Sequence, residues 1–328
     1  MKIAVDAMGG DHAPVEIVKG SVEAAREYGI PVILVGDHDR IHQELAQLSA
    51  SSESNIEVRH ASEVVGMDEH PANAMRRKTD SSIVVAGNLV INGEAEAMVS
   101  AGNTGAAMAV ATIKIGRIPG IGRPAIASFL PTMRGKCILL DAGANVDCSV
   151  DNLLQFAIMG KQYAESVLKV ENPRIGLLSI GEEPTKGDEL TKATNARLSS
   201  EDLNFIGNVE GKEIFRGAAD VVVCDGFAGN IVLKVAEGVG ELISKLLLDE
   251  LGSRSLLETA APALRVMKSK MDYSEYGGAP LLGVNGVCII GHGRSDGKAI
   301  RNAIRAAATA VENDVVGCIR ASVRQKNF

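Results

Sequence analysis

Three short segments of the chain combine glycine with side-chain amides or hydroxyls, and each directly follows an apolar run. They are AGNTG at 101–105, DAGAN at 141–145 and DGFAGN at 225–230. Glycine leaves backbone N–H groups open to a ligand, and the first N–H groups of a helix attract anions through the helix dipole. Since three such loops occur in one chain, they predict a phosphate site.

Cationic side chains in other loops are candidates to neutralise a bound anion. Lys186 is the most specific of them, because TKG follows an apolar run and precedes the helical pattern DELTKATNARL. A basic triplet such as RRK at 76–78 is more often a solvated surface than a binding site. The further candidates are Arg76, Arg77, Lys78, Lys234, His292 and Arg294.

The opening stretch MKIAVDAMGGDHAP contains groups that suit a metal, a phosphate or only a tight turn. Asp6, Asp11 and His12 are ligand types for a cation, but no partner set at metal-ligand spacing accompanies them. We therefore expect no metal, and we expect both carboxylates to accept hydrogen bonds that fix the loop. Gly9 and Gly10 permit a close backbone approach, and His12 is expected to donate to a bound oxyanion.

The elements that must position these groups follow a regular order. Apolar runs end in Gly, Asp or Asn and precede helical patterns in KIAVDAMGG, PVILVGD, EAMVSAGNTG, KCILLDAGAN, RIGLLSIGEE, DVVVCDGFAGN and VCIIGHGRSD. Strands that are apolar on both faces and alternate with helices predict a mostly parallel sheet covered on both sides. Ligands of such sheets gather at the carboxyl ends of the strands. We expect helices after Ser81 or Ser82 and over 152–167, in a single α/β domain spanning 1–328.

The segment 235–271 differs from this pattern and predicts a protruding helical hairpin with an apolar tip. Gly252 and Pro262 are expected to break the helical pattern before RVMKSK. The leucines of this tip are Leu256, Leu257 and Leu264. They either pack into the core or against a dimer partner, or they contact a membrane. The basic residues that flank them are Arg254, Arg265, Lys268 and Lys270. The apolar stripe consists of Val235, Val239, Leu242, Ile243, Leu246 and Leu247.

The composition excludes several classes of function. Lys and Arg number 34 against 41 Asp and Glu, and the net charge of −7 disfavours a general nucleic-acid binder. The apolar run at the start of the chain is too short for a signal peptide, and no apolar run is long enough to span a membrane. We therefore expect a cytoplasmic protein.

Five widely spaced cysteines indicate reduced, structural thiols. No P-loop, HExxH or GxSxG motif is present, and GIGRPA at 120–125 is a chance match to a dinucleotide fingerprint.

From Met1 to about residue 310, a set of motifs in fixed order resembles one family, the bacterial acyl-ACP:phosphate acyltransferases of the PlsX type. The motifs are MKIAVDAMGGDHAP, RRKTDSS, SAGNTGA, LDAGAN, GLLSIGEEPTKGDELT, NFIGNVEG, DVVVCDGFAGN and YGGAPLLGV. Their combination is far more specific than any single glycine-rich loop.

The resemblance implies transfer of a long acyl group from the thioester of acyl carrier protein to inorganic phosphate, without a metal or other cofactor. The acyl phosphate would feed a membrane glycerol-3-phosphate acyltransferase. The family's fold is a three-layer α/β/α architecture, similar to isocitrate and isopropylmalate dehydrogenases and to phosphotransacetylases. The resemblance also implies a homodimer and peripheral association with the inner face of the cell membrane.

The same resemblance implies roles for individual residues. Lys186 and Asn230, from TKG and DGFAGN, would stabilise charge that develops on the thioester oxygen or the phosphate. The phosphate pocket and its surroundings would comprise Asp6, Gly9, Gly10, Asp11, His12, Arg77, Gly102, Asn103, Thr104, Gly105, Asn145 and Asp225.

A long acyl chain also needs an apolar environment, since burial of each CH2 contributes about 0.8 kcal/mol. The resemblance therefore favours membrane contact by the hairpin tip, where basic side chains would bind acidic carrier protein or anionic lipid. The predicted contact residues are Leu251, Arg254, Leu256, Leu257, Leu264, Arg265 and Lys268. The alternatives are a short-chain phosphotransacetylase, a hydroxy-acid dehydrogenase on the same fold, and a non-catalytic scaffold that binds carrier protein or lipid.

Overall fold

The computed structural model describes residues 1–253, 256–271, 273–275 and 277–326. An 11-stranded sheet forms its centre, in the order β3-β2-β1-β4-β11-β10-β5-β6-β9-β7-β8. The strands are β1 Ile3–Asp6, β2 Val32–Gly36, β3 Ile56–His60, β4 Ala97–Ser100, β5 Ala125–Thr132, β6 Gly135–Leu140, β7 Ile175–Leu178, β8 Phe205–Val209, β9 Val221–Val223, β10 Ala279–Leu282 and β11 Val287–Ile290.

The sheet consists of two parallel halves that run in opposite directions. In the N-terminal half, β3, β2, β1, β4 and β11 are parallel, and in the C-terminal half, β6, β9, β7 and β8 are parallel. Antiparallel pairs join them, because β10 pairs with both β11 and β5, and β5 pairs with β6. The strand-end loops therefore form two separate groups, one for each half.

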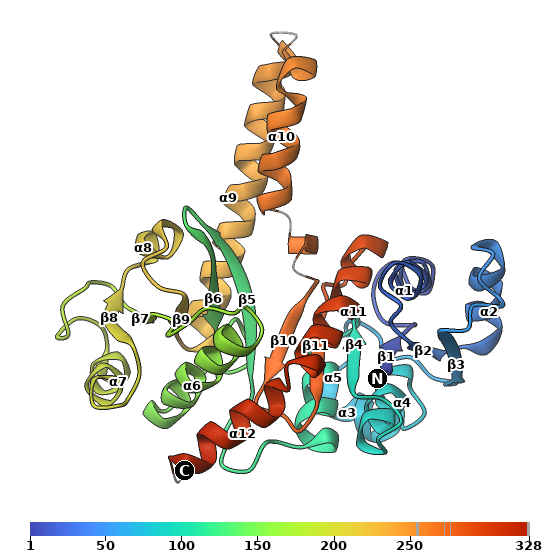
Figure 1. Ribbon diagram of the computed structural model, residues 1–328, viewed down its shortest axis with the longest axis horizontal. Coiled ribbons are helices and arrows are strands. Elements are labelled where there is room, and N and C mark those ends of the chain that lie inside the picture. Colours follow the sequence, from blue (N-terminus) through green and yellow to red (C-terminus); the bar gives the residue numbers. More distant parts are fainter. Residues whose placement is uncertain (254–255, 272, 276, 327–328) are drawn as a thin grey trace.

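Helices cover both faces of the sheet (Figure 1). The longer ones are α1 Val15–Tyr28, α2 His38–Gln47, α4 Ser82–Ile91, α6 Val150–Ser166, α7 Glu189–Ser199, α9 Gly226–Ser253, α10 Leu257–Met271, α11 Gly297–Glu312 and α12 Val315–Gln325. The shorter ones are α3 Pro71–Arg77, α5 Thr104–Ala109, α8 Gly211–Arg216, the π-helix η1 Val110–Ile115 and the 3-10 helix η2 Tyr273–Glu275.

Alternation along the strands explains the three layers. In β1, Ile3 and Val5 belong to the apolar cluster of α1 and α11, whereas Ala4 belongs to the cluster that contains α4 residues. In β6, Ile138 packs on the α6 side and Leu139 on the side of α8 and α9. Successive side chains of a strand point to opposite faces, so a continuous apolar run buries both faces. The predicted α/β/α architecture is confirmed.

The seven apolar runs form the predicted strands β1, β2, β4, β6, β7, β9 and β11. The helices expected after Ser81 and over 152–167 are confirmed as α4 and α6. A strand follows GIGRPA, so no helix N-terminus is present there to bind a dinucleotide. We did not predict β3, β5, β8 and β10. Strands β3 and β8 lie at the sheet edges and are only partly apolar, and prolines interrupt the apolar pattern of β5 and β10.

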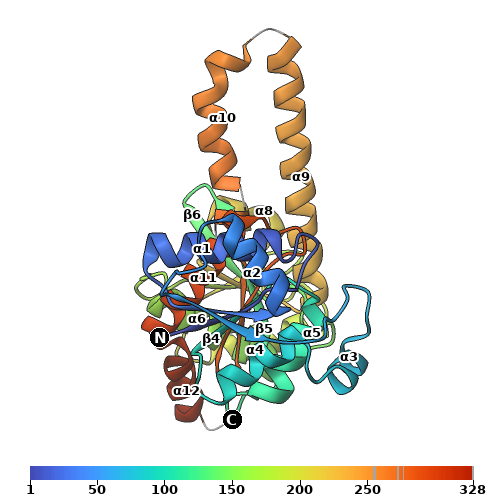
Figure 2. The same ribbon diagram turned by 90° about the vertical axis from the view of Figure 1, so that its right-hand side faces the viewer.

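Helices α9 and α10 leave the body of the protein and lie side by side as a long hairpin (Figures 1 and 2). The prediction that Gly252 and Pro262 break the helical pattern is wrong, because α9 includes Gly252 and α10 continues through Pro262. Proline removes a single backbone donor, and the rest of the α10 ladder remains. Among the described residues, no helix is both long enough and apolar enough to cross a bilayer.

Candidate active site

Asp6 joins the ends of β1 and β4 in the N-terminal half. Its carboxylate is almost fully buried and accepts a hydrogen bond from the Ser100 hydroxyl at 2.7 Å and one from the Met8 N–H at 3.3 Å. The Ser100 hydroxyl oxygen also accepts from the Gly102 N–H at 3.1 Å. Burial raises the pKa of Asp6, and hydrogen bonds from Ser82 and Ser100 oppose this rise. Asp6 therefore fixes two strand-end loops relative to each other.

The glycine pair of the opening loop is required by close packing. A Cβ at Gly9 would lie 2.9 Å from the Gly102 nitrogen, and Gly10 has a φ of +112°. The Asp11 N–H donates to the Gly293 carbonyl at 2.8 Å, so the loop after β11 joins the same group. The side chains of Asp11 and His12 are exposed. This loop therefore places both side chains at the surface where the ends of β1, β4 and β11 meet.

Asn103 makes its side-chain hydrogen bonds within the protein. Its oxygen accepts from the Ala106 N–H at the start of α5, and its amide nitrogen donates to three carbonyls of the segment 66–69, between 2.8 and 3.2 Å. Thr104 is exposed in the first turn of α5. Gly105 lies against Pro71, the first residue of α3, and α3 carries exposed Arg77 in its last turn. Asn103 thus positions a loop, and Thr104 is the member of this segment open to a ligand.

Asp141 shapes the loop that follows β6 in the C-terminal half. Its side chain is fully buried and accepts hydrogen bonds from the N–H groups of Ile126, Gly143, Ala144 and Asn145, between 2.7 and 3.3 Å. The Asn145 amide donates to Asp141 at 2.9 Å and to the Pro124 carbonyl at 2.7 Å. Both Asp141 and Asn145 are therefore committed to holding the loop.

Helix α9 begins against this loop. The Asp225 carboxylate accepts from the Ala228 N–H at 2.8 Å, and the Gly226 N–H donates to the Asn145 carbonyl at 2.7 Å. A Cβ at Gly143 would lie 3.5 Å from the Asn230 side chain, which is exposed. Asn230 is therefore the polar side chain that this assembly presents to solvent next to the bare Gly143 backbone.

Lys186 lies in the loop after β7, and β7 pairs with β9, the strand that leads to Asn230. Its side chain is exposed and forms no ion pair with any residue that the structure describes. Its N–H donates to the Glu183 carbonyl at 3.0 Å, which tightens the loop. The loops carrying Lys186, Asn230 and Asn145 thus follow three adjacent strands.

The two halves approach each other at His292, in the loop after β11. Partial burial lowers the pKa of His292, as do the charges of Lys234 and Arg294, while Glu237 and Asp11 act in the opposite direction. Lys234 and Glu237 belong to α9 and form an ion pair at 2.8 Å. Leu233 of α9 also packs on an apolar cluster that contains Ile290 and Ala142. Residues from the loops after β1 and β11 and from α9 therefore share one electrostatic environment, which we call the junction.

The cysteines are poorly suited to nucleophilic catalysis. Burial raises the pKa of Cys224, as do the nearby carboxylates of Asp225 and Asp141, and burial raises the pKa of Cys148 to about 11. Thiolate is the reactive form, and it is scarce at neutral pH under these conditions. All five cysteines are free thiols. Among the described residues, no group of three or more His, Cys, Asp or Glu is arranged to hold a metal ion.

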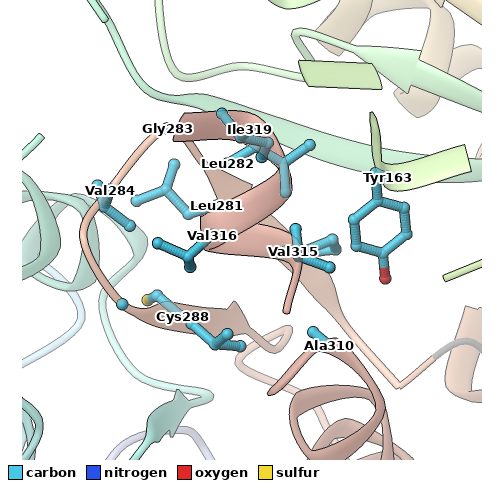
Figure 3. A pocket seen from close by; sticks show the side chains of 13 residues that line it. Tyr163, Leu281, Leu282, Gly283, Val284, Cys288, Ala310, Val315, Val316 and Ile319 are labelled. Carbon is cyan, nitrogen blue, oxygen red and sulfur yellow. The ribbon is translucent and has the colours of Figure 1, made fainter. Parts of the chain in front are cut away.

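A small apolar cavity lies between β10, β11 and α12, with Tyr163 at one side (Figure 3). Its volume is about 10 Å³, which is comparable to one water molecule and too small for a substrate. This cavity is therefore not the candidate active site, which consists of the strand-end loops and the junction between them.

Two side chains central to this geometry were missing from the predicted site. In the sequence, Asp141 stands out only as part of DAGAN, and Ser100 only as the end of an apolar run. A charged residue directly after an apolar strand and before glycine is the signal for Asp141, since Asp6 occupies the same kind of position in β1. No local signal marks Ser100, because its role depends on the pairing of β4 with β1.

The fold is that of phosphotransacetylases. A phosphotransacetylase from Streptococcus pyogenes matches with a TM-score of 0.65 and 18% identity, covering 95% of this chain and 94% of that one. The EutD phosphotransacetylase from Staphylococcus aureus matches with a TM-score of 0.61 and 17% identity, covering 95% and 94%. At such identities the likeness establishes the fold alone.

Sequence comparison defines the family. The family described as "Fatty acid synthesis protein" matches residues 1–317. The phosphate acyltransferase of Heliobacterium modesticaldum is 53% identical, covering 99% of this chain and 98% of the relative. That of Pelotomaculum thermopropionicum is 54% identical, covering 98% and 95%. The chain belongs to this family of acyltransferases, and the resemblance inferred from the motifs is confirmed.

Proposed function

We propose that this protein transfers a long-chain acyl group from the thioester of acyl carrier protein to inorganic phosphate, and that the acyl phosphate serves phospholipid synthesis. The name shared by its relatives supports acyl transfer to phosphate. The geometric observation that carries the proposal is that Lys186 and Asn230 are both exposed after adjacent strands, and that Asn230 lies against a glycine loop fixed by Asp141.

In the proposed reaction a phosphate oxygen attacks the thioester carbonyl carbon. A C–O bond forms, the C–S bond breaks, and the thiolate of the carrier protein leaves and takes up a proton from the phosphate or from water. Phosphate is already nucleophilic at neutral pH and a thiolate leaves readily, so catalysis needs positioning and charge stabilisation above all. Lys186 and Asn230 would stabilise the developing oxyanion, and exposed His12, Thr104 and Arg77 would contribute to phosphate binding.

Direct attack by phosphate is favoured over a covalent acyl-enzyme. The raised pKa of Cys148 and Cys224 disfavours a cysteine nucleophile. The proposed chemistry also needs neither a metal nor another cofactor, because backbone amides and a lysine supply the positive charge.

The test is to incubate the purified protein with hexadecanoyl-acyl carrier protein and inorganic phosphate, and to trap acyl phosphate with hydroxylamine. We expect hydroxamate that requires both phosphate and protein. A preparation that yields none would overturn the proposed activity and favour a non-catalytic scaffold. Hydroxamate from short acyl thioesters of coenzyme A, and none from the long-chain donor, would favour a short-chain phosphotransacetylase.

Lys186→Ala tests the proposed catalytic group. We expect kcat to fall at least about 100-fold, as for removal of one oxyanion-stabilising donor. Lys192→Ala is the matched control, because Lys192 is also exposed but pairs with Glu189 on α7. Normal turnover in Lys186→Ala would remove Lys186 from the site.

The outer end of the hairpin is the proposed contact for the inner face of the cell membrane and for the carrier protein. Leu256 and Leu257 are 44% and 40% exposed, so they do not pack into the core of this chain. Leu251 and Leu264 are partly buried, and Arg265 is exposed nearby. Arg254 and the side chain of Lys268 lie outside the described residues. Membrane contact through such a tip is compatible with a cytoplasmic protein that has no spanning helix among its described residues.

Leu256→Asp combined with Leu257→Asp should reduce co-sedimentation with anionic vesicles while leaving activity in solution unchanged. Unchanged co-sedimentation would instead assign the tip to the proposed homodimer. Downstream use by a membrane glycerol-3-phosphate acyltransferase is part of the same proposal, because a product released at the membrane is close to a membrane enzyme.

A further inference from the structure

The motif NFIGNVEG, at 204–211, has no role in the site described above, although it contains a buried asparagine close to Lys186. The motif includes β8, the strand at the edge of the sheet, which pairs with β7. Ile206 of this strand is exposed, whereas the side chain of Asn208 is buried. A buried amide needs hydrogen-bond partners, because an unpaired buried polar group costs free energy. The partners of Asn208 therefore indicate what this side chain does.

The backbone carbonyl of Glu183 connects Asn208 to Lys186. This oxygen accepts one hydrogen bond from the side-chain amide of Asn208 at 2.9 Å and another from the backbone N–H of Lys186 at 3.0 Å. A carbonyl oxygen has two lone pairs, so it can accept from both donors at once. Only one backbone oxygen therefore separates Asn208 from the main chain of the proposed catalytic lysine.

Asn195 on α7 fixes the orientation of the Asn208 amide. The side-chain nitrogen of Asn195, which is also buried, donates to the side-chain oxygen of Asn208 at 2.8 Å. Because this bond uses the oxygen of Asn208, the nitrogen of Asn208 faces the Glu183 carbonyl, which can only accept. Helix α7 and strands β7 and β8 lie together at one end of the sheet (Figure 1). The hydrogen bonds thus run from a helix through an edge strand to the loop of Lys186.

The loop of Lys186 is attached to the rest of the protein at few points. Residues 182–186 are all exposed. At the start of the loop, the Ser179 N–H donates to the backbone of β8 at 3.0 Å, and at its end Asp188 caps α7. Between these ends, the bond from Asn208 is the only hydrogen bond that joins the loop to another element among the residues that the structure describes. Asn208 is therefore the central attachment of the loop.

We infer that Asn208 is a positioning residue for Lys186, with its own orientation fixed by Asn195. This inference rests on the proposed function, in which Lys186 stabilises the oxyanion. Such a group is effective only when its donor lies where the charge develops. The stem of Lys186 packs over Gly181, where a Cβ would lie 3.0 Å from the lysine Cγ. A fixed Lys186 backbone and a packed stem together restrict the positions that the amine can reach.

The test is a double-mutant cycle of Asn208→Ala and Lys186→Ala, with hexadecanoyl-acyl carrier protein, phosphate and hydroxylamine. We expect Asn208→Ala to lower kcat at least about tenfold and to leave the KM for phosphate within about twofold of wild type. In the Lys186→Ala background the same change should alter kcat by less than about twofold, because the group that it positions is absent. An equal factor in both backgrounds, or an unchanged kcat in Asn208→Ala, would overturn the inference.

Asn302→Ala is the matched control for the loss of a buried amide. Asn302 on α11 is buried, and its side-chain nitrogen donates to the Ser274 carbonyl at 2.8 Å. The control removes the same type of hydrogen bond far along the chain from Lys186, so we expect kcat within about twofold of wild type. A loss of kcat in the control as large as that in Asn208→Ala would assign the effect to general destabilisation and overturn the inference.

Asn208→Asp preserves the shape of the side chain and tests the donor itself, and it replaces Asn208→Ala in the cycle if the alanine variant does not fold. The variant places a carboxylate oxygen against the Glu183 carbonyl, so we expect a loss of kcat near neutral pH that is at least about tenfold. Protonation of the carboxyl restores an O–H donor, so kcat relative to wild type should rise as the pH falls. Wild-type kcat near neutral pH would overturn the inference.

Amide hydrogen exchange of the segment 179–188 tests the attachment independently of catalysis. We expect the Lys186 N–H to exchange at least about tenfold faster in Asn208→Ala than in wild type or in Asn302→Ala. Equal exchange in all three proteins would overturn the inference. Wild-type protein that yields no hydroxamate would contradict the proposed function instead, and the exchange rates alone would then decide whether Asn208 holds the loop.

Discussion

Each half of the sheet contains a buried aspartate at the carboxyl end of a strand, but the two carboxylates hold different parts of the structure in place. Asp6 accepts hydrogen bonds from serine hydroxyls and loop amides, and it links β1 to β4, which pair in the sheet. Asp141 accepts mainly from the backbone of its own loop, which it shapes against the start of α9. The N-terminal half thus connects several strand ends, whereas the C-terminal half builds one hydrogen-bonded loop beside Asn230.

The largest expected effect comes from Asp141→Ala. The change leaves the N–H groups of Ile126 and the 143–145 loop without their acceptor in a fully buried site. We expect the free energy of unfolding to fall by about 4 kcal/mol, measured by urea denaturation. Asp141→Asn keeps one acceptor oxygen and should lose less. A loss below about 1 kcal/mol in Asp141→Ala would contradict the view that this carboxylate holds the loop.

Asp6→Ala should have the second largest effect, with a loss of about 3 kcal/mol in the same measurement. The loss is smaller because hydroxyl donors such as Ser100 can rotate toward another acceptor, whereas backbone amides cannot. If Asp6→Ala destabilised the protein more than Asp141→Ala, the contrast between the two halves would be reversed.

Ser100→Ala isolates one contact of the Asp6 network. The variant loses the hydrogen bond to Asp6 and the one from the Gly102 N–H, so we expect a loss of about 1.5 kcal/mol. Ser21→Ala is the control, because Ser21 is also buried but its hydroxyl donates to Ile17 within its own helix. That control should lose about 0.5 kcal/mol or less. Equal losses in both variants would show that the hydrogen bond linking β1 and β4 contributes nothing to the free energy of unfolding.

The smallest expected effect concerns the junction and is a change in titration. Burial, with the charges of Lys234 and Arg294, lowers the pKa of His292 below its ordinary value of about 6.5. Folding thus favours the neutral imidazole: His292 stabilises the protein above pH of about 6.5, and this contribution is lost as the pH falls through the lower, folded-state pKa. Lys234→Gln should raise that pKa, as measured by NMR of labelled histidine, and should reduce the loss of stability on acidification.

If the pKa of His292 were unchanged in Lys234→Gln, the charge on α9 would not act on the loop after β11. The junction would then not be a single electrostatic environment. Lys245→Gln is the control, because Lys245 lies farther along α9 and is not among the charges that shift the pKa of His292.

Local pattern was sufficient for much of the fold and for the chemical character of the site. The buried strands and the glycine loops are predictable because each has a pattern within a short, continuous stretch of sequence. A strand that is apolar on both faces appears as an apolar run, and a turn with open backbone amides appears as a glycine-rich segment. The edge strands β3 and β8 were missed because a half-exposed strand lacks this pattern, and β5 and β10 because Pro131 and Pro280 interrupt it. Pro262 does not end a helix as its residue type predicts, since α10 continues through it.

The sequence by itself determined the family, the strand-helix rhythm and the presence of several amide-rich loops. Only the tertiary structure decided that the loops form two groups, because the antiparallel pairing of β10 and β5 reverses the direction of the second half. It also decided that Asn103 and Asn145 hold loops while Asn230 and Lys186 face solvent. Sequence spacing gives a residue type and its neighbours along the chain, whereas the partner of a side chain is set by elements that are distant in sequence and adjacent in space.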